Sequence, residues 1–157
     1  MKKTVLCLST LLLLTGCSDN EVGDVSLGLF PLKDIKLDPM VDPIVTGVTC
    51  HIASVEANLS LSDPSDSSIA CRQTGEITPE MIAQIDKSKS GEVILKKSKS
   101  IFFKNMKVRR ILDPENQTLM YLSYSTKETT GSFKHSLSTV PLWGTKAYVT
   151  PPPAPSN

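Results

Sequence analysis

The chain has 157 residues, a formal net charge of +1, 21% charged residues and 39% hydrophobic residues. This length and composition predict one ordinary domain with a hydrophobic core, and the near-neutral charge predicts no particular partner. Two histidines, far apart, and no dense group of acids exclude the usual zinc and calcium patterns. No glycine-rich phosphate loop is present, so we expect neither a metal nor a cofactor.

The first 16 residues have the pattern of a cleaved leader. Lys2 and Lys3 precede an apolar run that ends at Leu14 and is too short to span a membrane in the mature protein. The next residues, Leu14-Thr15-Gly16-Cys17, resemble the lipobox of bacterial lipoproteins. The resemblance implies that residues 1–16 are removed and that Cys17 carries a diacylglyceryl thioether and an N-linked acyl chain such as palmitate. The alternative is ordinary cleavage nearby, which leaves Cys17 as a plain thiol.

A lipidated Cys17 predicts a protein that is anchored to a membrane without crossing it. Two or more acyl chains hold a protein stably, because each buried methylene contributes about 0.8 kcal/mol. Ser18 after the cysteine favours sorting to the outer membrane on the side that faces the periplasm, whereas Asp in that position favours the inner membrane. Residues 17–24 are polar and acidic and suit a short tether. Nucleic acid is not an expected partner in that compartment.

Loss of the leader and lipidation of Cys17 leave Cys50 and Cys71 as the remaining cysteines. In an oxidising compartment the simplest expectation is one disulfide, which closes a loop of about 22 residues and contributes roughly 3 kcal/mol in the chain-entropy model. The alternative is a redox or metal-binding pair, although the spacing is far from C-x-x-C.

The expected domain covers residues 25–145, and its first half contains two strands. The dipeptides Asp38-Pro39 and Asp42-Pro43 predict turns. Residues 44–55 alternate as a strand that directs Val48, Cys50 and Ile52 to one face. A Ser-, Asp- and Pro-rich loop over residues 60–68 precedes a second strand at residues 69–74.

The second half begins with a short helix and continues as strands. Thr78 is the expected N-cap and Pro79 the first residue of a helix that extends to Lys87. Strands are then predicted at residues 92–97, 100–112, 118–125 and 136–143, with a hairpin turn over 113–116. Pro141 confines the last strand to an edge or an end. Residues 146–157 form the expected Pro-rich, disordered tail. The predicted class is α+β: a mainly antiparallel sheet, sandwich- or barrel-like, with one short helix.

Several short motifs, in order, resemble the CreA family of small periplasmic bacterial proteins. The residues that carry the resemblance are Asp42-Pro43, Val48-Thr49-Cys50, Ile69-Ala70-Cys71-Arg72-Gln73, Gly75, Gly91-Glu92-Val93, Phe103-Lys104, Tyr121-Leu122-Ser123-Tyr124-Ser125 and Val140-Pro141. The resemblance covers roughly residues 23–143 and implies secretion and a paired Cys50 and Cys71. It supplies no reaction, ligand or active-site residue. The lipobox and a shorter loop without glycine between the cysteines depart from the family pattern.

A basic segment is the most unusual compositional feature of the domain. Residues 93–112 contain no acid and seven Lys or Arg residues, of which Lys104, Lys107, Arg109 and Arg110 are our candidates for anion binding. Such a segment attracts anionic lipid or an acidic envelope protein. The alternative is a solvated outer face whose balancing acids lie on neighbouring strands.

No catalytic constellation is evident, so the sequence favours a non-catalytic binding or structural module of the envelope. The first alternative is a hydrolase of an envelope polymer that uses His51 with a nearby acid, and it requires a cleft that joins the two. Strand alternation places His51 and Cys50 on opposite faces, which disfavours a cysteine nucleophile with this base. A second alternative is a small-molecule binding domain with an apolar pocket between the sheet and the helix.

Overall fold

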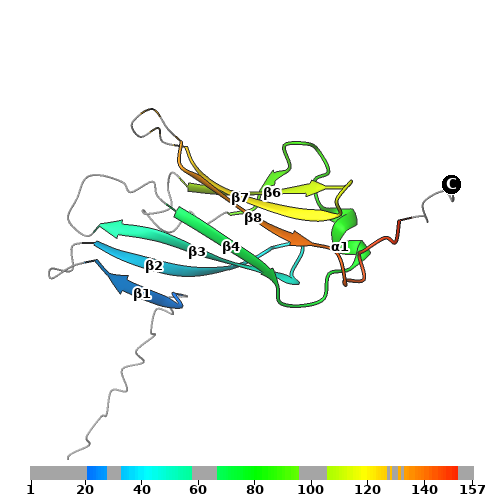
Figure 1. Ribbon diagram of the computed structural model, residues 1–157, viewed down its shortest axis with the longest axis horizontal. Coiled ribbons are helices and arrows are strands. Elements are labelled where there is room, and N and C mark those ends of the chain that lie inside the picture. The colour runs from blue at the N-terminus through cyan, green and yellow to red at the C-terminus, as the bar shows by residue number, and fades with distance from the viewer. Residues whose placement is uncertain are drawn as a thin grey trace, which may run out of the picture.

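The computed structural model describes residues 21–27, 33–57, 67–95, 106–126, 128, 131 and 133–151. The leader, Cys17, most of the loop at 60–68, the strand residues expected at 96–97 and 100–105, Lys104 and the end of the tail lie outside these ranges. The described strands form two open four-stranded antiparallel sheets, with one short helix between them in the sequence (Figure 1). The predicted α+β class, sandwich-like in arrangement, is therefore confirmed, and the sheets do not close into a barrel.

Each sheet is a meander of consecutive strands. The first, which we call sheet A, contains β1 Gly23–Ser26, β2 Lys33–Val41, β3 Val48–Ala57 and β4 Ser67–Gln73, in that order. The second, sheet B, contains β5 Glu92–Val93, β6 Met106–Asp113, β7 Thr118–Ser125 and β8 His135–Pro141. The helix α1 spans Pro79–Gln84 and lies in the connection between the sheets.

The core lies between the inner faces of the sheets. In β3 the alternation is as predicted, with Val48, Cys50 and Ile52 buried and the residues between them partly exposed. In β7 every second residue is buried, including Leu119 and Tyr121. These inner faces supply most of the buried apolar side chains, because the side chains of a strand point alternately to its two faces.

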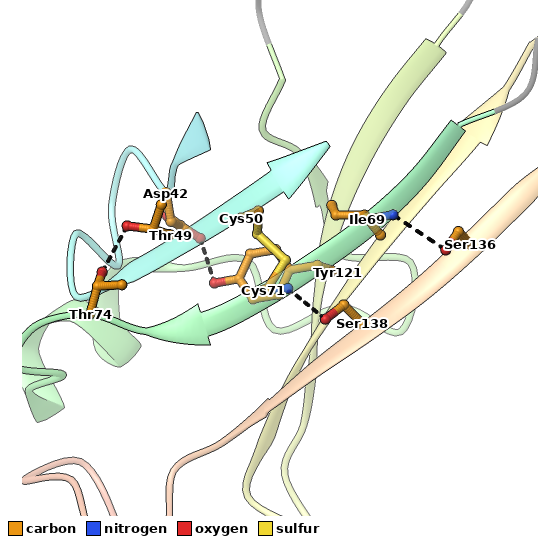
Figure 2. The surroundings of a disulfide bond; sticks show 9 residues. All are labelled: Asp42, Thr49, Cys50, Ile69, Cys71, Thr74, Tyr121, Ser136 and Ser138. Atoms are coloured by element: carbon orange, nitrogen blue, oxygen red, sulfur yellow. Dashed lines mark hydrogen bonds between the residues drawn. A yellow bond between two sulfur atoms is a disulfide. The ribbon is translucent and has the colours of Figure 1, made fainter. Parts of the chain in front are cut away.

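The edge strands β4 and β8 lie against each other, and serine hydroxyls from β8 connect them. The Cys71 N–H donates to Ser138 Oγ at 2.8 Å, and the Ile69 N–H donates to Ser136 Oγ at 3.4 Å (Figure 2). Both amides point away from β3 and would otherwise form an open sheet edge. The hydroxyls therefore satisfy that edge and fix the packing of the two sheets.

The helix begins as predicted but ends three residues early. Thr78 is the N-cap, its Oγ1 accepts from the Met81 N–H at 3.4 Å, and Pro79 is at the start of the helix. Ile85 leaves the helical conformation, with φ −78° and ψ 156°, and its side chain is buried in the core. Burial of this side chain offsets the lost helical turn.

One of the two predicted Asp-Pro turns is wrong. Pro39 lies inside β2 opposite His51 of β3, whereas Asp42-Pro43 does begin a turn. The Leu37 carbonyl accepts from Val22 on the β1 side, so the nitrogen of Pro39, two residues further on, faces that side too. Because β1 begins opposite Leu37 and does not extend beside Pro39, no described strand requires an N–H from Pro39.

Candidate functional site

Cys50 and Cys71 form the predicted disulfide. They are direct neighbours on β3 and β4, with 3.9 Å between their Cα atoms, and Cys50 is fully buried. The Cys71 N–H is directed to Ser138 and not to β3, so this is a pair without mutual backbone hydrogen bonds, in which side chains approach most closely. The sequence predicted the pairing, and the register explains why it forms at this position.

A line of polar side chains crosses the inner face of sheet B. Glu92 of β5 lies opposite Arg110 of β6, Arg110 opposite Tyr121 of β7, and Tyr121 opposite Ser138 of β8. Four successive strands thus place four polar residues in one line. Ser138 accepts from the Cys71 N–H, so this line of polar residues meets the disulfide where β8 packs against β4.

Asp42 reaches this line from the turn after β2. Its Oδ1 accepts from the Ile44 N–H at 2.9 Å and the Val45 N–H at 2.8 Å, which caps the turn that Pro43 begins. Its Oδ2 accepts from Tyr121 Oη at 2.8 Å (Figure 2). The Asp42 carboxylate also forms an ion pair with the Arg110 guanidinium. We call Asp42, Glu92, Arg110 and Tyr121 the ionic cluster.

The ionic cluster is closed to solvent at its centre. The side chain of Asp42 is 0% exposed and that of Arg110 is 1% exposed, whereas Glu92, which pairs with the other end of the guanidinium, is 34% exposed. A buried ion is tolerated only when it is paired and its remaining polar atoms are satisfied. Here the one guanidinium bridges two carboxylates, and both oxygens of Asp42 accept hydrogen bonds.

Tyr121 takes part in the cluster as a neutral donor. Burial raises the pKa of its phenol, and the negative charge of Asp42 and the hydrogen bond to it raise the pKa further, while Arg110 opposes them. The phenol therefore keeps its proton and donates a hydrogen bond to the Asp42 carboxylate.

The segment before β5 is fitted closely to Arg110. Gly91 has φ +57°, and a Cβ atom built there would lie 2.0 Å from the Arg110 carbonyl oxygen, so a glycine is required on both counts. Nearby, the Arg109 guanidinium donates to the carbonyls of Ser90 at 2.8 Å and Gly91 at 3.2 Å. These contacts hold Glu92 next to Arg110.

The arrangement fits a structural role for the cluster. Asp42, Arg110 and Tyr121 are sealed from any substrate, and the two nearby sulfurs are bonded to each other. What the cluster can do is join the turn after β2, in sheet A, to β5, β6 and β7 of sheet B through charge and hydrogen bonds that are stronger in a low-dielectric interior.

Our prediction that Arg110 binds anions at the surface is wrong. An anion-binding role requires an accessible guanidinium, but this one is buried and already paired with Asp42 and Glu92. Lys107 is exposed on the opposite face of β6, Arg109 is half-buried on that face, and Lys104 lies outside the described residues. The strand period did contain the signal, because Arg110 shares its face with Val108, which is fully buried.

His51 has no acid partner among the described residues. It lies on β3 between Pro39 of β2 and Ala70 of β4, on the face opposite Cys50. Within the described ranges, no group of three or more His, Cys, Asp and Glu side chains could hold a metal ion. No helix in the described part of the chain has the length and hydrophobicity needed to cross a membrane.

Fold and site together define a small protein of two packed antiparallel meanders. The Cys50–Cys71 disulfide links two strands of sheet A, and the buried ionic cluster joins the two sheets. Residues 22–145 match the family described as CreA protein. The chain belongs to the CreA family. It is 34% identical to Protein CreA of Escherichia coli strain K12 over 151 residues, which are 90% of this chain and 95% of that protein. Protein CreA of the strains CFT073 and O157:H7 gives the same values. No solved structure matches significantly.

Proposed function

We propose that this CreA-family protein is a lipid-anchored protein of the bacterial envelope that acts as a non-catalytic binding or structural module. The observation that carries the proposal is the sequence Leu14-Thr15-Gly16-Cys17 after a charged and apolar leader. In this proposal Cys17 is the acylated first residue, residues 17–24 are the tether, and the domain faces the periplasm from the outer membrane.

The disulfide supports export. Structural disulfides persist in oxidising compartments and are rare where glutathione and thioredoxin keep thiols reduced. Cys50 is buried in the core and Cys71 is partly exposed, so the bond is part of the folded domain.

The closed ionic cluster supports a module that binds or supports other components without chemistry. The buried groups Asp42, Arg110 and Tyr121 bond to one another across the two sheets, and no acid among the described residues contacts His51. The hydrolase alternative therefore has no supporting geometry in this part of the chain.

Mass spectrometry of the protein from its native membrane tests the anchor. Trypsin should release residues 17–33 as one peptide, because no Lys or Arg occurs before Lys33 in this range. We expect this peptide to carry the mass of a diacylglyceryl group and a third acyl chain, and to be absent in a Cys17→Ser variant. An unmodified Cys17 thiol, or residues 1–16 still attached, would refute the anchor.

Separation of the two membranes by density tests the sorting. Ser18 predicts recovery with the outer membrane, and a Ser18→Asp variant should move to the inner membrane. Recovery of the unaltered protein with the inner membrane would contradict the prediction, while acylation of Cys17 would still stand.

A further inference from the structure

The outer face of sheet B presents a second surface, which the ionic cluster does not use. On β6, β7 and β8 the residues that alternate with the buried ones point outward, and the strand register places them in four rows, the second of which continues to Val93 of β5. From one end of the sheet to the other these rows are Lys107, Tyr124 and His135; Arg109, Leu122 and Leu137; Ile111, Met120 and Thr139; and Asp113, Thr118 and Pro141. We call these twelve residues the outer face.

The middle of the outer face is apolar. Leu137 is 56% exposed, and its cross-strand neighbour Leu122 is half-buried, as are Met120 and Ile111 in the next row. None of the four belongs to the core or packs against it. Among the described elements, the strand of sheet A that packs against β7 and β8 is β4. It packs on the inner side, where Ser138 lies, and therefore does not cover the outer face. Contiguous apolar patches on a surface mark interaction sites, and in this patch Leu137 is the exposed member while its three apolar neighbours are half-buried.

Charge is separated along the outer face. The exposed cation Lys107 lies at one end with Tyr124 and His135, and Arg109 follows in the next row with its guanidinium bonded to the Ser90 and Gly91 carbonyls. Asp113 lies at the other end and is hydrogen-bonded to Asn116. The two ends are about 20 Å apart, because alternate residues of a strand are separated by about 6.8 Å. A partner that fits this face is therefore negatively charged beside the apolar rows.

The size of the outer face indicates which kind of partner. Three strands spaced about 4.8 Å apart and four rows cover roughly 14 by 20 Å. This is well below the roughly 800 Å² that each partner contributes to a stable protein interface, so a second copy held by this face alone is not expected. A small surface is sufficient when the protein is already tethered, because the tether supplies a high effective concentration.

We propose that the outer face of sheet B docks on a phospholipid bilayer that exposes anionic headgroups. Leu137 and Leu122 enter the interfacial region, Tyr124 lies at headgroup level, and Lys107 faces the lipid phosphates. This inference rests on the proposed function, in that the anchor at Cys17 holds the domain near the membrane.

Vesicle binding by protein that cannot be acylated tests docking separately from anchoring. The probe is a chain of residues 17–157 with Cys17→Ser, which contains every described residue. Its sedimentation is measured with vesicles of phosphatidylcholine and with vesicles that also contain phosphatidylglycerol. We expect binding to the phosphatidylglycerol vesicles, weaker at high salt, to fall about fivefold with Lys107→Gln and about tenfold with Leu137→Ser.

Sheet A provides matched controls. Val41 is 56% exposed, as Leu137 is, and it occupies the same outer row as the exposed Arg72, with Thr49 between them. Val41→Ser and Arg72→Gln remove the same kinds of group from the other side of the molecule. These two substitutions should leave vesicle binding unchanged.

Three vesicle results would overturn the docking proposal: no binding to phosphatidylglycerol vesicles, equal binding to phosphatidylcholine alone, and equal losses in the test and control variants. A fourth result, sedimentation of a dimer that Leu137→Ser dissociates, would overturn it in favour of a second copy. The state of Cys17 in cells is measured independently, so docking can fail while the anchor stands, and the reverse.

Discussion

Removal of the Asp42 carboxylate is the most direct test of the ionic cluster. Asp42→Ala leaves the buried Arg110 guanidinium paired with Glu92 alone, and Glu92 is the more exposed of its two partners. It also leaves the Tyr121 hydroxyl and the Ile44 and Val45 amides without their acceptor. Breaking one side of a buried ion pair costs about 3–5 kcal/mol, and the stranded donors add to that cost. A domain of this size is stable by only about 5–15 kcal/mol, so the variant should lose a large share of its free energy of unfolding.

Urea denaturation with the disulfide intact measures this effect. The midpoint for Asp42→Ala should fall sharply, and the slope should stay close to that of the unaltered protein. Asp113→Ala is the matched control, since Asp113 also accepts from a backbone amide, that of Asn116 at 3.1 Å, but at an exposed turn. Its loss should be far smaller. Adding Arg110→Met to Asp42→Ala should recover part of the stability, because the unpaired charge is then gone.

An Asp42→Ala variant within about 1 kcal/mol of the unaltered protein would refute the reasoning. It would mean that Arg110 reaches solvent or a different acceptor. Equal losses for Asp42→Ala and Asp113→Ala would also contradict the cluster, since burial is the difference between the two carboxylates.

The remaining predictions concern the disulfide, one glycine and the response to alkali. Replacing both Cys50 and Cys71 with serine should lower the free energy of unfolding by roughly 3 kcal/mol in urea titrations, and a reductant should then have no further effect. Gly91→Ala should destabilise the protein more than Gly144→Ala: both glycines have positive φ, but a Cβ at Gly144 meets nothing within 4 Å. The free energy of unfolding should fall as the pH rises above 10.0, the ordinary pKa of tyrosine, because the unfolded chain then releases the Tyr121 proton that the folded state retains. Tyr121→Phe should be less stable at neutral pH and should lose less stability in alkali, and an unchanged alkaline slope would contradict the raised pKa.

Local signals predicted the strands and the helix start well. The alternation of Val48, Cys50 and Ile52 fixed the inner face of β3, and Thr78 with Pro79 fixed the start of α1. These features depend on neighbours in the sequence, which is what propensity and periodicity report. The end of α1 and the position of Pro39 depend instead on the core and on where β1 begins, so local patterns missed them.

The ionic cluster was hidden for the same reason. Asp42 and Arg110 are 68 residues apart in the sequence, and their contact exists only because one sheet packs on the other. Counting charges along residues 93–112 grouped Arg110 with the surface cations Lys107 and Arg109. Counting by strand period would have separated it, since a cation on the same face as buried aliphatic residues needs a buried acid.

The position of the disulfide has a consequence for how this chain can vary. Cys50 and Cys71 fix the register of β3 on β4, so the register does not depend on the length of the connection between the two strands. Doubling the length of a flexible connection costs only about 0.6 kcal/mol. Insertions and deletions between the two strands should therefore accumulate among relatives without disturbing the hairpin, and this stretch offers a natural place for a peptide tag.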